Sequence, residues 1–175
     1  MSTVSAEPTA PTGSVHAGWS HTDVGLLLVR IVPFGVLAVF GAQKLFGAFG
    51  GGGLAATEAS FAQMGYHPAL PFALLGGTCE FVGGLLVMSG LLMPLATAMV
   101  MGVMINAFAA VADKPLENSG LAIVLFMSAA ALAFAGPGRF ALDAGRPWQR
   151  VGIRWGAASL TLAVVTAVPS LLVAH

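Results

Sequence analysis

One stretch of the chain, from Leu70 to Met93, constrains the fold more than any other. It is almost entirely apolar and, at about 1.5 Å per helical residue, it reaches about 36 Å, which is enough to cross a bilayer. A single charge, Glu80, stands near its middle. A carboxylate at that depth costs roughly 3 kcal/mol to insert, so it faces protein or water rather than lipid. The stretch therefore predicts a membrane helix packed inside a bundle.

Glycines flank Glu80 at helical spacing. Gly76 and Gly77 precede it by four and three residues, and Gly83 and Gly84 follow it by three and four. In a helix these positions share one face with Glu80. Because small residues let a neighbouring backbone approach closely, we expect this face to pack against another helix.

The composition fixes the class of protein. The chain is 57% hydrophobic and only 8% charged, whereas soluble domains carry about 25% charged residues. Seven basic and seven acidic residues give no net charge, which excludes the basic footprint of a nucleic-acid-binding protein. The single cysteine, Cys79, excludes an internal disulfide and a CxxC redox pair. We therefore predict an all-α integral membrane protein.

Four further apolar runs are long enough to be spanning helices. They are residues 24–46, 95–112, 120–135 and 151–174. Asp23 is the predicted N-cap of the first of them. The expected fold is a four-helix transmembrane bundle with a fifth, C-terminal spanning helix.

The remaining segments define the domain organisation. Residues 1–22, rich in Ser, Thr, Pro, Ala and Gly, predict a disordered tail. The bundle core is expected over 23–143, with an outer connection at 47–69 that holds a short amphipathic segment at 54–64. Residues 144–175 add a basic loop and the fifth helix.

Charge predicts the orientation of the bundle. Arg139, Arg146 and Arg150 all lie between the fourth and fifth spans. Basic loops remain in the cytoplasm. We therefore expect the N-terminus to be cytoplasmic and the 47–69 connection to lie outside.

Three polar residues are predicted at similar depths within the bundle: Arg30, Glu80 and Asn106. Counting residues from the helix ends, we expect Arg30 to pair with Glu80 and Asn106 to lie beside them, as a buried polar layer that is a candidate ligand or proton site. Two alternatives stay open: Arg30 snorkels to the near interface, and Glu80 forms an ion pair that is purely structural. No group of residues predicts a metal site.

Three motifs occur in the order found in one family. They are FGAQKLFG at 40–47, E-x-x-G-G-L at 80–85 and GPGRFALD at 136–143. Over about residues 24–143 the chain resembles the DoxX family of small bacterial and archaeal membrane proteins. The motif positions by this resemblance are Gln43, Lys44, Glu80, Gly136, Gly138, Arg139 and Asp143.

The resemblance implies a four-helix core in a bacterial plasma membrane. It also implies a link to redox chemistry, since relatives of DoxD type belong to a thiosulfate:quinone oxidoreductase. In mycobacterial relatives the link is to a membrane complex with superoxide dismutase and a sulfurtransferase. Many members carry a histidine toward the end of the third helix, where this chain has Asn106 and Asp113.

The first functional hypothesis is a membrane component of a redox or oxidative-stress-linked assembly that binds quinone beside Arg30, Glu80 and Asn106. The sequence has no mid-span histidine for haem, no cysteine cluster and no dinucleotide-binding glycine loop. We therefore expect no covalently bound cofactor and no self-contained redox centre. Electrons would come from a soluble redox partner, and whether the chain is itself an enzyme stays open.

Two other functions remain as alternatives. One is a non-catalytic membrane scaffold that recruits soluble partners. The other is a small transporter that uses Glu80, since intramembrane carboxylates mark ion paths. Under each hypothesis the chain contacts the lipid bilayer, and homo-oligomerisation is compatible with all three.

Overall fold

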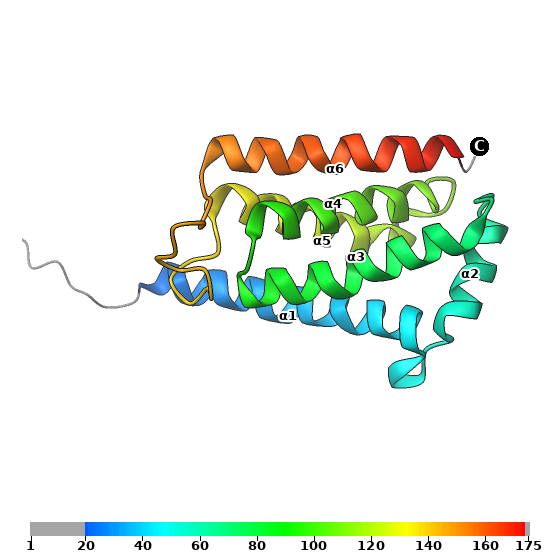
Figure 1. The fold of residues 1–175 in the computed structure, drawn as a ribbon, viewed down its shortest axis with the longest axis horizontal. Coiled ribbons are helices and arrows are strands. Elements are labelled where there is room, and N and C mark those ends of the chain that lie inside the picture. Colours follow the sequence, from blue (N-terminus) through cyan, green and yellow to red (C-terminus); the bar gives the residue numbers. More distant parts are fainter. Residues whose placement is uncertain (1–19, 174–175) are drawn as a thin grey trace, which may run out of the picture.

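The computed structural model describes residues 20–173, and the regular elements in this range are all helices (Figure 1). The α-helices are α1 (His21–Phe46), α2 (Gly53–Gln63), α3 (Ala69–Ser89), α4 (Met93–Ala109), α5 (Gly120–Ala135) and α6 (Ile153–Val173). Short 3₁₀ turns, η1 (Ala48–Gly50) and η2 (Leu116–Asn118), lie in two connections. The predicted all-α fold is confirmed. Most of the predicted disordered tail lies outside the described residues.

In Figure 1 the helices α1, α3, α4, α5 and α6 run lengthwise through the molecule, and α2 lies across one end. Of the described helices, α1, α3 and α6 are long and apolar enough to cross a bilayer. α4 and α5 are apolar but shorter, at 17 and 16 residues, or about 25 Å. Local bilayer thinning accommodates such spans. The chain is therefore a multi-pass membrane protein in which α6 is added to a bundle of α1, α3, α4 and α5.

α1 begins within the predicted tail, at His21. Ser20 is its N-cap, and the Ser20 side chain accepts a hydrogen bond from the Asp23 N–H at 3.2 Å. The Asp23 carboxylate accepts in return from the Ser20 N–H at 2.9 Å. Asp23 is therefore the reciprocal residue of a capping box, and its prediction as the cap was wrong by one helical turn.

The turn between α3 and α4 differs from the predicted one. α3 ends at Ser89, earlier than expected, because Gly90 adopts the left-handed region with φ 73°. Leu92 is also left-handed, with φ 47°, which strains a residue that has a Cβ. The Leu92 N–H donates to Asp143 Oδ2 at 2.6 Å, and α4 begins at the next residue.

Glycines bring α1 and α3 into close contact. A methyl group on Gly41 would collide with the backbone of Phe81, and one on Gly84 would lie 2.7 Å from Phe34 O and 2.9 Å from Ala38 N. Only glycine permits this approach, and it fixes the register of the two antiparallel helices. The predicted small-residue packing around Glu80 is confirmed at these positions.

The other glycines of α3 face different neighbours. A methyl group on Gly77 would meet Leu45 of α1, whereas one on Gly76 would meet Phe61 of α2 at 3.0 Å. Gly83 faces α4. The glycines around Glu80 thus pack against three neighbouring helices, α1, α2 and α4.

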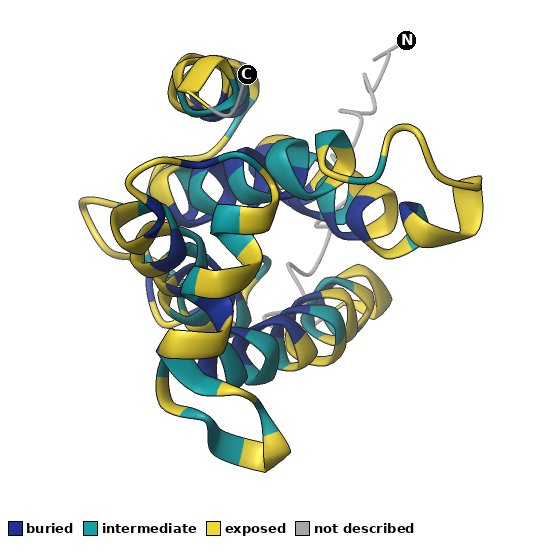
Figure 2. Cartoon of the chain, turned by 90° about the vertical axis from the view of Figure 1, so that its right-hand side faces the viewer, coloured by how far each residue is buried: buried dark blue, intermediate teal, exposed yellow. Residues whose placement is uncertain are grey.

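α6 packs along α4 at the edge of the bundle. The Ser159 hydroxyl donates to Pro94 O at 2.8 Å, and Gly102 of α4 leaves room for Thr166 and Ala163 of α6. Figure 2 shows α6, marked by the C-terminus, standing outside the other helices with an exposed outer face. That face is apolar and suits contact with lipid acyl chains.

Candidate functional site

The three residues of the predicted polar layer lie in different surroundings. Glu80 is 4% exposed and forms a salt bridge with Lys44 of α1. Both of its carboxylate oxygens accept from Lys44 Nζ. The predicted pairing of Glu80 with Arg30 is therefore wrong. The alternative of a structural ion pair fits Glu80, with Lys44 as the partner.

Arg30 is fully buried in the N-terminal half of α1, whereas Lys44 lies in its last turn. Its guanidinium lies against Gly90 at the end of α3. None of its three side-chain nitrogens has a hydrogen-bond partner among the described residues. Because the side chain is 0% exposed, the snorkelling alternative for Arg30 is also wrong.

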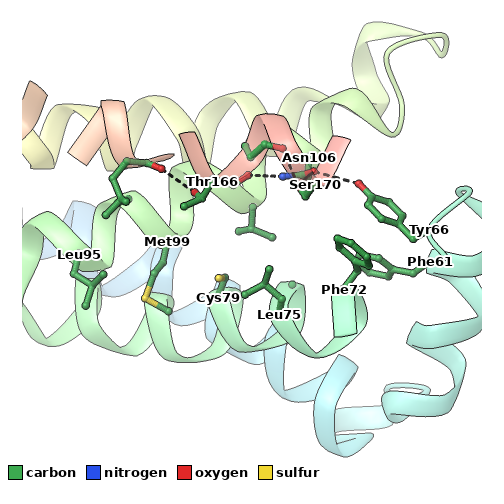
Figure 3. A pocket seen from close by; sticks show the side chains of 16 residues that line it. Phe61, Tyr66, Phe72, Leu75, Cys79, Leu95, Met99, Asn106, Thr166 and Ser170 are labelled. Carbon is green, nitrogen blue, oxygen red and sulfur yellow. Dashed lines mark hydrogen bonds between the residues drawn. The ribbon is translucent and has the colours of Figure 1, made fainter. Parts of the chain in front are cut away.

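Asn106 borders a cavity of about 380 Å³, which we call the Asn106 cavity. It lies between α3, α4 and α6, and the segment that links α2 to α3 closes one end (Figure 3). Its lining residues are Phe61, Tyr66, Phe72, Leu75, Gly76, Cys79, Leu95, Ala98, Met99, Gly102, Val103, Asn106, Leu162, Thr166, Ala167 and Ser170. Most of these side chains are apolar, and the polar groups gather on one wall.

Hydrogen bonds around Asn106 join three parts of the chain (Figure 3). Asn106 Oδ1 accepts from the Tyr66 hydroxyl at 3.2 Å and from the Ser170 hydroxyl at 2.8 Å. Asn106 Nδ2 donates to Gly102 O at 3.0 Å. An amide that accepts twice is held in one orientation, so the donors and acceptors of this wall are fixed in place.

Aromatic rings form the end of the cavity next to this wall. The Tyr66 ring centroid lies 5.2 Å from that of Phe61 and 4.9 Å from that of Phe72. Burial raises the pKa of Tyr66 above its ordinary value, so its hydroxyl remains protonated and serves as a donor. The rings offer flat apolar surface to a planar ligand.

Cys79 lies on α3, across the cavity from Asn106 and Ser170 (Figure 3). It is the only cysteine of the chain and is partly buried. Glu80, the next residue, faces α1 instead of the cavity. The predicted site thus retains Asn106, whereas Arg30 and Glu80 do not line the cavity.

Sequence reasoning missed Tyr66, Thr166 and Ser170. Tyr66 is the only tyrosine of the chain and lies in a turn between helices, which was the one signal that could have marked it. Thr166 and Ser170 lie four residues apart in an apolar run. The Thr166 hydroxyl donates to Leu162 O, and the Ser170 hydroxyl shares its one hydrogen between Asn106 Oδ1 and Ala167 O. Serine and threonine often bond the backbone of their own helix in this way, so their types alone did not indicate a site.

The GPGRFALD motif fastens two helix ends together. Asp143 is 3% exposed, and its carboxylate accepts from the Leu92 N–H and from Trp148 Nε1, each at 2.6 Å. The Arg139 N–H donates to Asp23 Oδ1 at 3.0 Å, which attaches the loop to the start of α1.

The glycines of the GPGRFALD motif adopt backbone conformations with positive φ. Gly136 and Gly138 have φ of 82° and 74°, which side-chain-bearing residues rarely adopt. In the FGAQKLFG motif at 40–47, Gln43 Nε2 donates to Phe49 O at 3.3 Å and holds the turn after α1. The motif positions therefore have structural roles at both ends of the bundle.

Comparison with known proteins identifies the family. No curated protein and no solved structure matches the chain. The DoxX family model matches residues 25–113, just over half of the chain's 175 residues. The match runs from α1 to the end of α4, so it includes Asn106 and Tyr66, while α6 lies beyond it. The chain belongs to the DoxX family.

Proposed function

We propose that this DoxX protein binds an isoprenoid quinone in the Asn106 cavity and serves a membrane redox assembly. The observation that carries the proposal is an apolar cavity inside a membrane bundle with one fixed polar wall. Its volume of about 380 Å³ falls within the range of small-molecule sites. In this account the protein lies in a bacterial plasma membrane with its arginine-rich end in the cytoplasm.

The lining suits both parts of a quinone. A quinone ring is flat, and its two carbonyls accept hydrogen bonds. Asn106 Nδ2 carries two hydrogens, and its bond to Gly102 O uses one. The Tyr66 hydroxyl is a second donor that a ligand carbonyl can take over. The aliphatic side chains of α3, α4 and α6 offer an apolar path for the isoprenoid tail.

The chain's own residues bind and orient the ligand in this proposal. A quinone accepts two electrons and two protons when it is reduced. The described residues hold no group of three or more His, Cys, Asp or Glu side chains that could bind a metal ion, and we assign the electron donor to a partner protein. The transporter alternative has weaker support, because Glu80 is paired with Lys44 away from the cavity.

Cys79 provides a built-in reporter for the test. The purified protein in nanodiscs is alkylated with N-ethylmaleimide while decylubiquinone, whose fully substituted ring does not add thiols, is titrated. The proposal predicts that alkylation of Cys79 slows as quinone occupies the cavity. The Asn106→Ala variant should need more quinone for the same protection, and the matched Asn118→Ala variant in the exposed η2 turn should behave as wild type.

Two outcomes would count against the proposal. One is an alkylation rate that does not change with quinone concentration. The other is equal protection in wild type and Asn106→Ala. Either result would favour the scaffold alternative, in which the bundle recruits soluble partners without binding quinone.

A further inference from the structure

A second hollow lies at the other end of the bundle, away from the Asn106 wall. This groove, of about 180 Å³, runs between the start of α4, the loop before α6 and the first turn of α6. We call it the Trp148 groove. Its lining includes the apolar side chains of Leu92 and Leu95 near the start of α4, together with Trp148, Arg150 and Trp155 from the loop and α6.

Each tryptophan ring of the groove has an arginine guanidinium over it in a cation–π contact. The Arg146 guanidinium lies 5.6 Å from the Trp148 ring, and that of Arg150 lies 5.2 Å from the Trp155 ring. A guanidinium stacked on a ring keeps its N–H groups in the plane, where they can bind a phosphate in a fork. The groove thus combines an apolar slot with one lining cation, Arg150, and a second cation, Arg146, over the ring of Trp148 beside it.

A hydrogen bond to Asp143 holds the Trp148 indole in place. Trp148 Nε1 donates to Asp143 Oδ1 at 2.6 Å, while Asp143 Oδ2 accepts from Leu92 N. The Asp143 carboxylate, which borders the groove, is therefore engaged on both oxygens, and the residue is 3% exposed. It anchors the wall and presents little negative charge to a ligand.

In the part of the chain that the structure describes, the exposed charge at this end is positive. Arg139, Arg146, Arg150 and Arg154 are all exposed, whereas the carboxylates of Asp23 and Asp143 are buried. At the opposite end, the connection after α4 instead exposes Asp113 and Glu117 beside Lys114. Among the described residues, the groove therefore lies in the basic half of a chain that has no net charge overall.

We infer that the Trp148 groove binds an anionic phospholipid of the phosphatidylglycerol type. Its phosphate would bond Arg146 and Arg150, and the upper part of one acyl chain would lie along Leu92 and Leu95. Charge complementarity selects an anionic headgroup. The apolar side favours a lipid over a free phosphate ion, and tryptophans of this kind lie at the depth of lipid headgroups. This inference does not depend on the quinone proposal.

Tryptophan fluorescence tests it directly. In a Trp19→Phe background, the remaining tryptophans are Trp148 and Trp155. Brominated phosphatidylglycerol, titrated into the protein in neutral detergent, should quench them at a much lower mole fraction than brominated phosphatidylcholine. Equal quenching by the two lipids would overturn the inference, and this comparison needs no change to the arginines.

An arginine variant localises the lipid. Each cation near a membrane surface contributes about fivefold to the affinity for an anionic lipid. The double variant Arg146→Gln with Arg150→Gln should therefore lower the phosphatidylglycerol affinity measured by quenching by about 30-fold. Lys114→Gln, at the opposite end, should leave it unchanged. Unchanged affinity in the double variant would refute the site. Inorganic phosphate, compared with chloride at equal ionic strength, should not displace the lipid; displacement would show a site for free anions instead.

Discussion

Glu80 takes Lys44 as its partner because glycine contacts fix the register of α1 against α3. Gly41 abuts the Phe81 backbone, which places Glu80 near the α2 end of α1, within reach of Lys44. The same register places Arg30 against Gly90, about 15 Å along α3 from Glu80. Counting depth from the loops could not supply this register, since it depends on which glycine meets which backbone.

The ion pair predicts a strong asymmetry between single substitutions. Lys44→Met leaves the buried Glu80 carboxylate unpaired and should cost about 3 kcal/mol of unfolding free energy. Glu80→Gln should cost less, because the Lys44 side chain is 38% exposed and can reach water. The double variant should be more stable than the sum of the singles by about 1–2 kcal/mol, as measured by denaturant unfolding in detergent.

A second cycle serves as the control. Arg30→Met combined with Glu80→Gln should give additive losses, because these side chains do not meet. Coupling between Arg30 and Glu80, together with none between Lys44 and Glu80, would reverse the assignment.

Gly90 offers a second test at the residue scale. Gly90→Ala should be severely destabilising, because Gly90 has a positive φ and its new methyl group would collide with Arg30 Nη1 and lie 2.9 Å from Ala141 Cα. Gly145→Ala is the matched control, since Gly145 has φ 72° and no neighbour within 4 Å. The control should cost about 1–2 kcal/mol from backbone strain alone. Equal losses in thermal unfolding would show that neither Arg30 nor Ala141 packs against Gly90.

At the scale of helices, periodicity and composition predicted most of the architecture. The 120–135 helix was predicted with its observed bounds, and α2 (Gly53–Gln63) lies one residue before the expected 54–64 segment. Two of the boundaries that failed have local causes, since Gly90 ends α3 with a positive φ and Ser20 begins α1 with a capping box. The start of α4 depends on a tertiary contact. α3 stops at Ser89 and α4 starts at Met93, where Asp143, distant in sequence, bonds the strained Leu92. No local pattern encodes that contact.

The Asp143 contact predicts a large effect from one substitution. Asp143→Ala removes two short hydrogen bonds to a buried carboxylate and should cost about 3 kcal/mol or more. Asp113→Ala, in the exposed loop after α4, should cost less than about 0.5 kcal/mol. If Asp143→Ala lowered the unfolding free energy no more than Asp113→Ala in the same assay, that result would contradict the role of Asp143 in holding this loop to the start of α4.

At the scale of the whole molecule, the distribution of charge predicts the orientation. In a Cys79→Ala background, an impermeant maleimide added outside intact cells should label Ser60→Cys and should not label Gly145→Cys. Both positions are exposed and lie at opposite ends of the bundle. Labelling of Gly145→Cys alone would invert the topology.

The cavity itself was only partly predictable. Asn106 stood out as a polar residue among small ones, but the cavity also needs Tyr66 from a turn and Ser170 from the last helix. These residues meet because α6 packs beside α4 and the 64–68 turn brings Tyr66 to Asn106. The depth of a residue in the membrane and the helix face on which it lies can be estimated from one helix at a time. A cavity, in contrast, depends on how three helices pack together.

The quinone content of the protein taken directly from its membrane tests the central claim. The chain would be extracted with its native lipids in polymer nanodiscs, and isoprenoid quinone per protein would be measured by mass spectrometry. The account predicts enrichment over bulk lipid for wild type and for Asn118→Ala, with the enrichment lost in Asn106→Ala. A quinone content equal to that of bulk lipid in all three would contradict it.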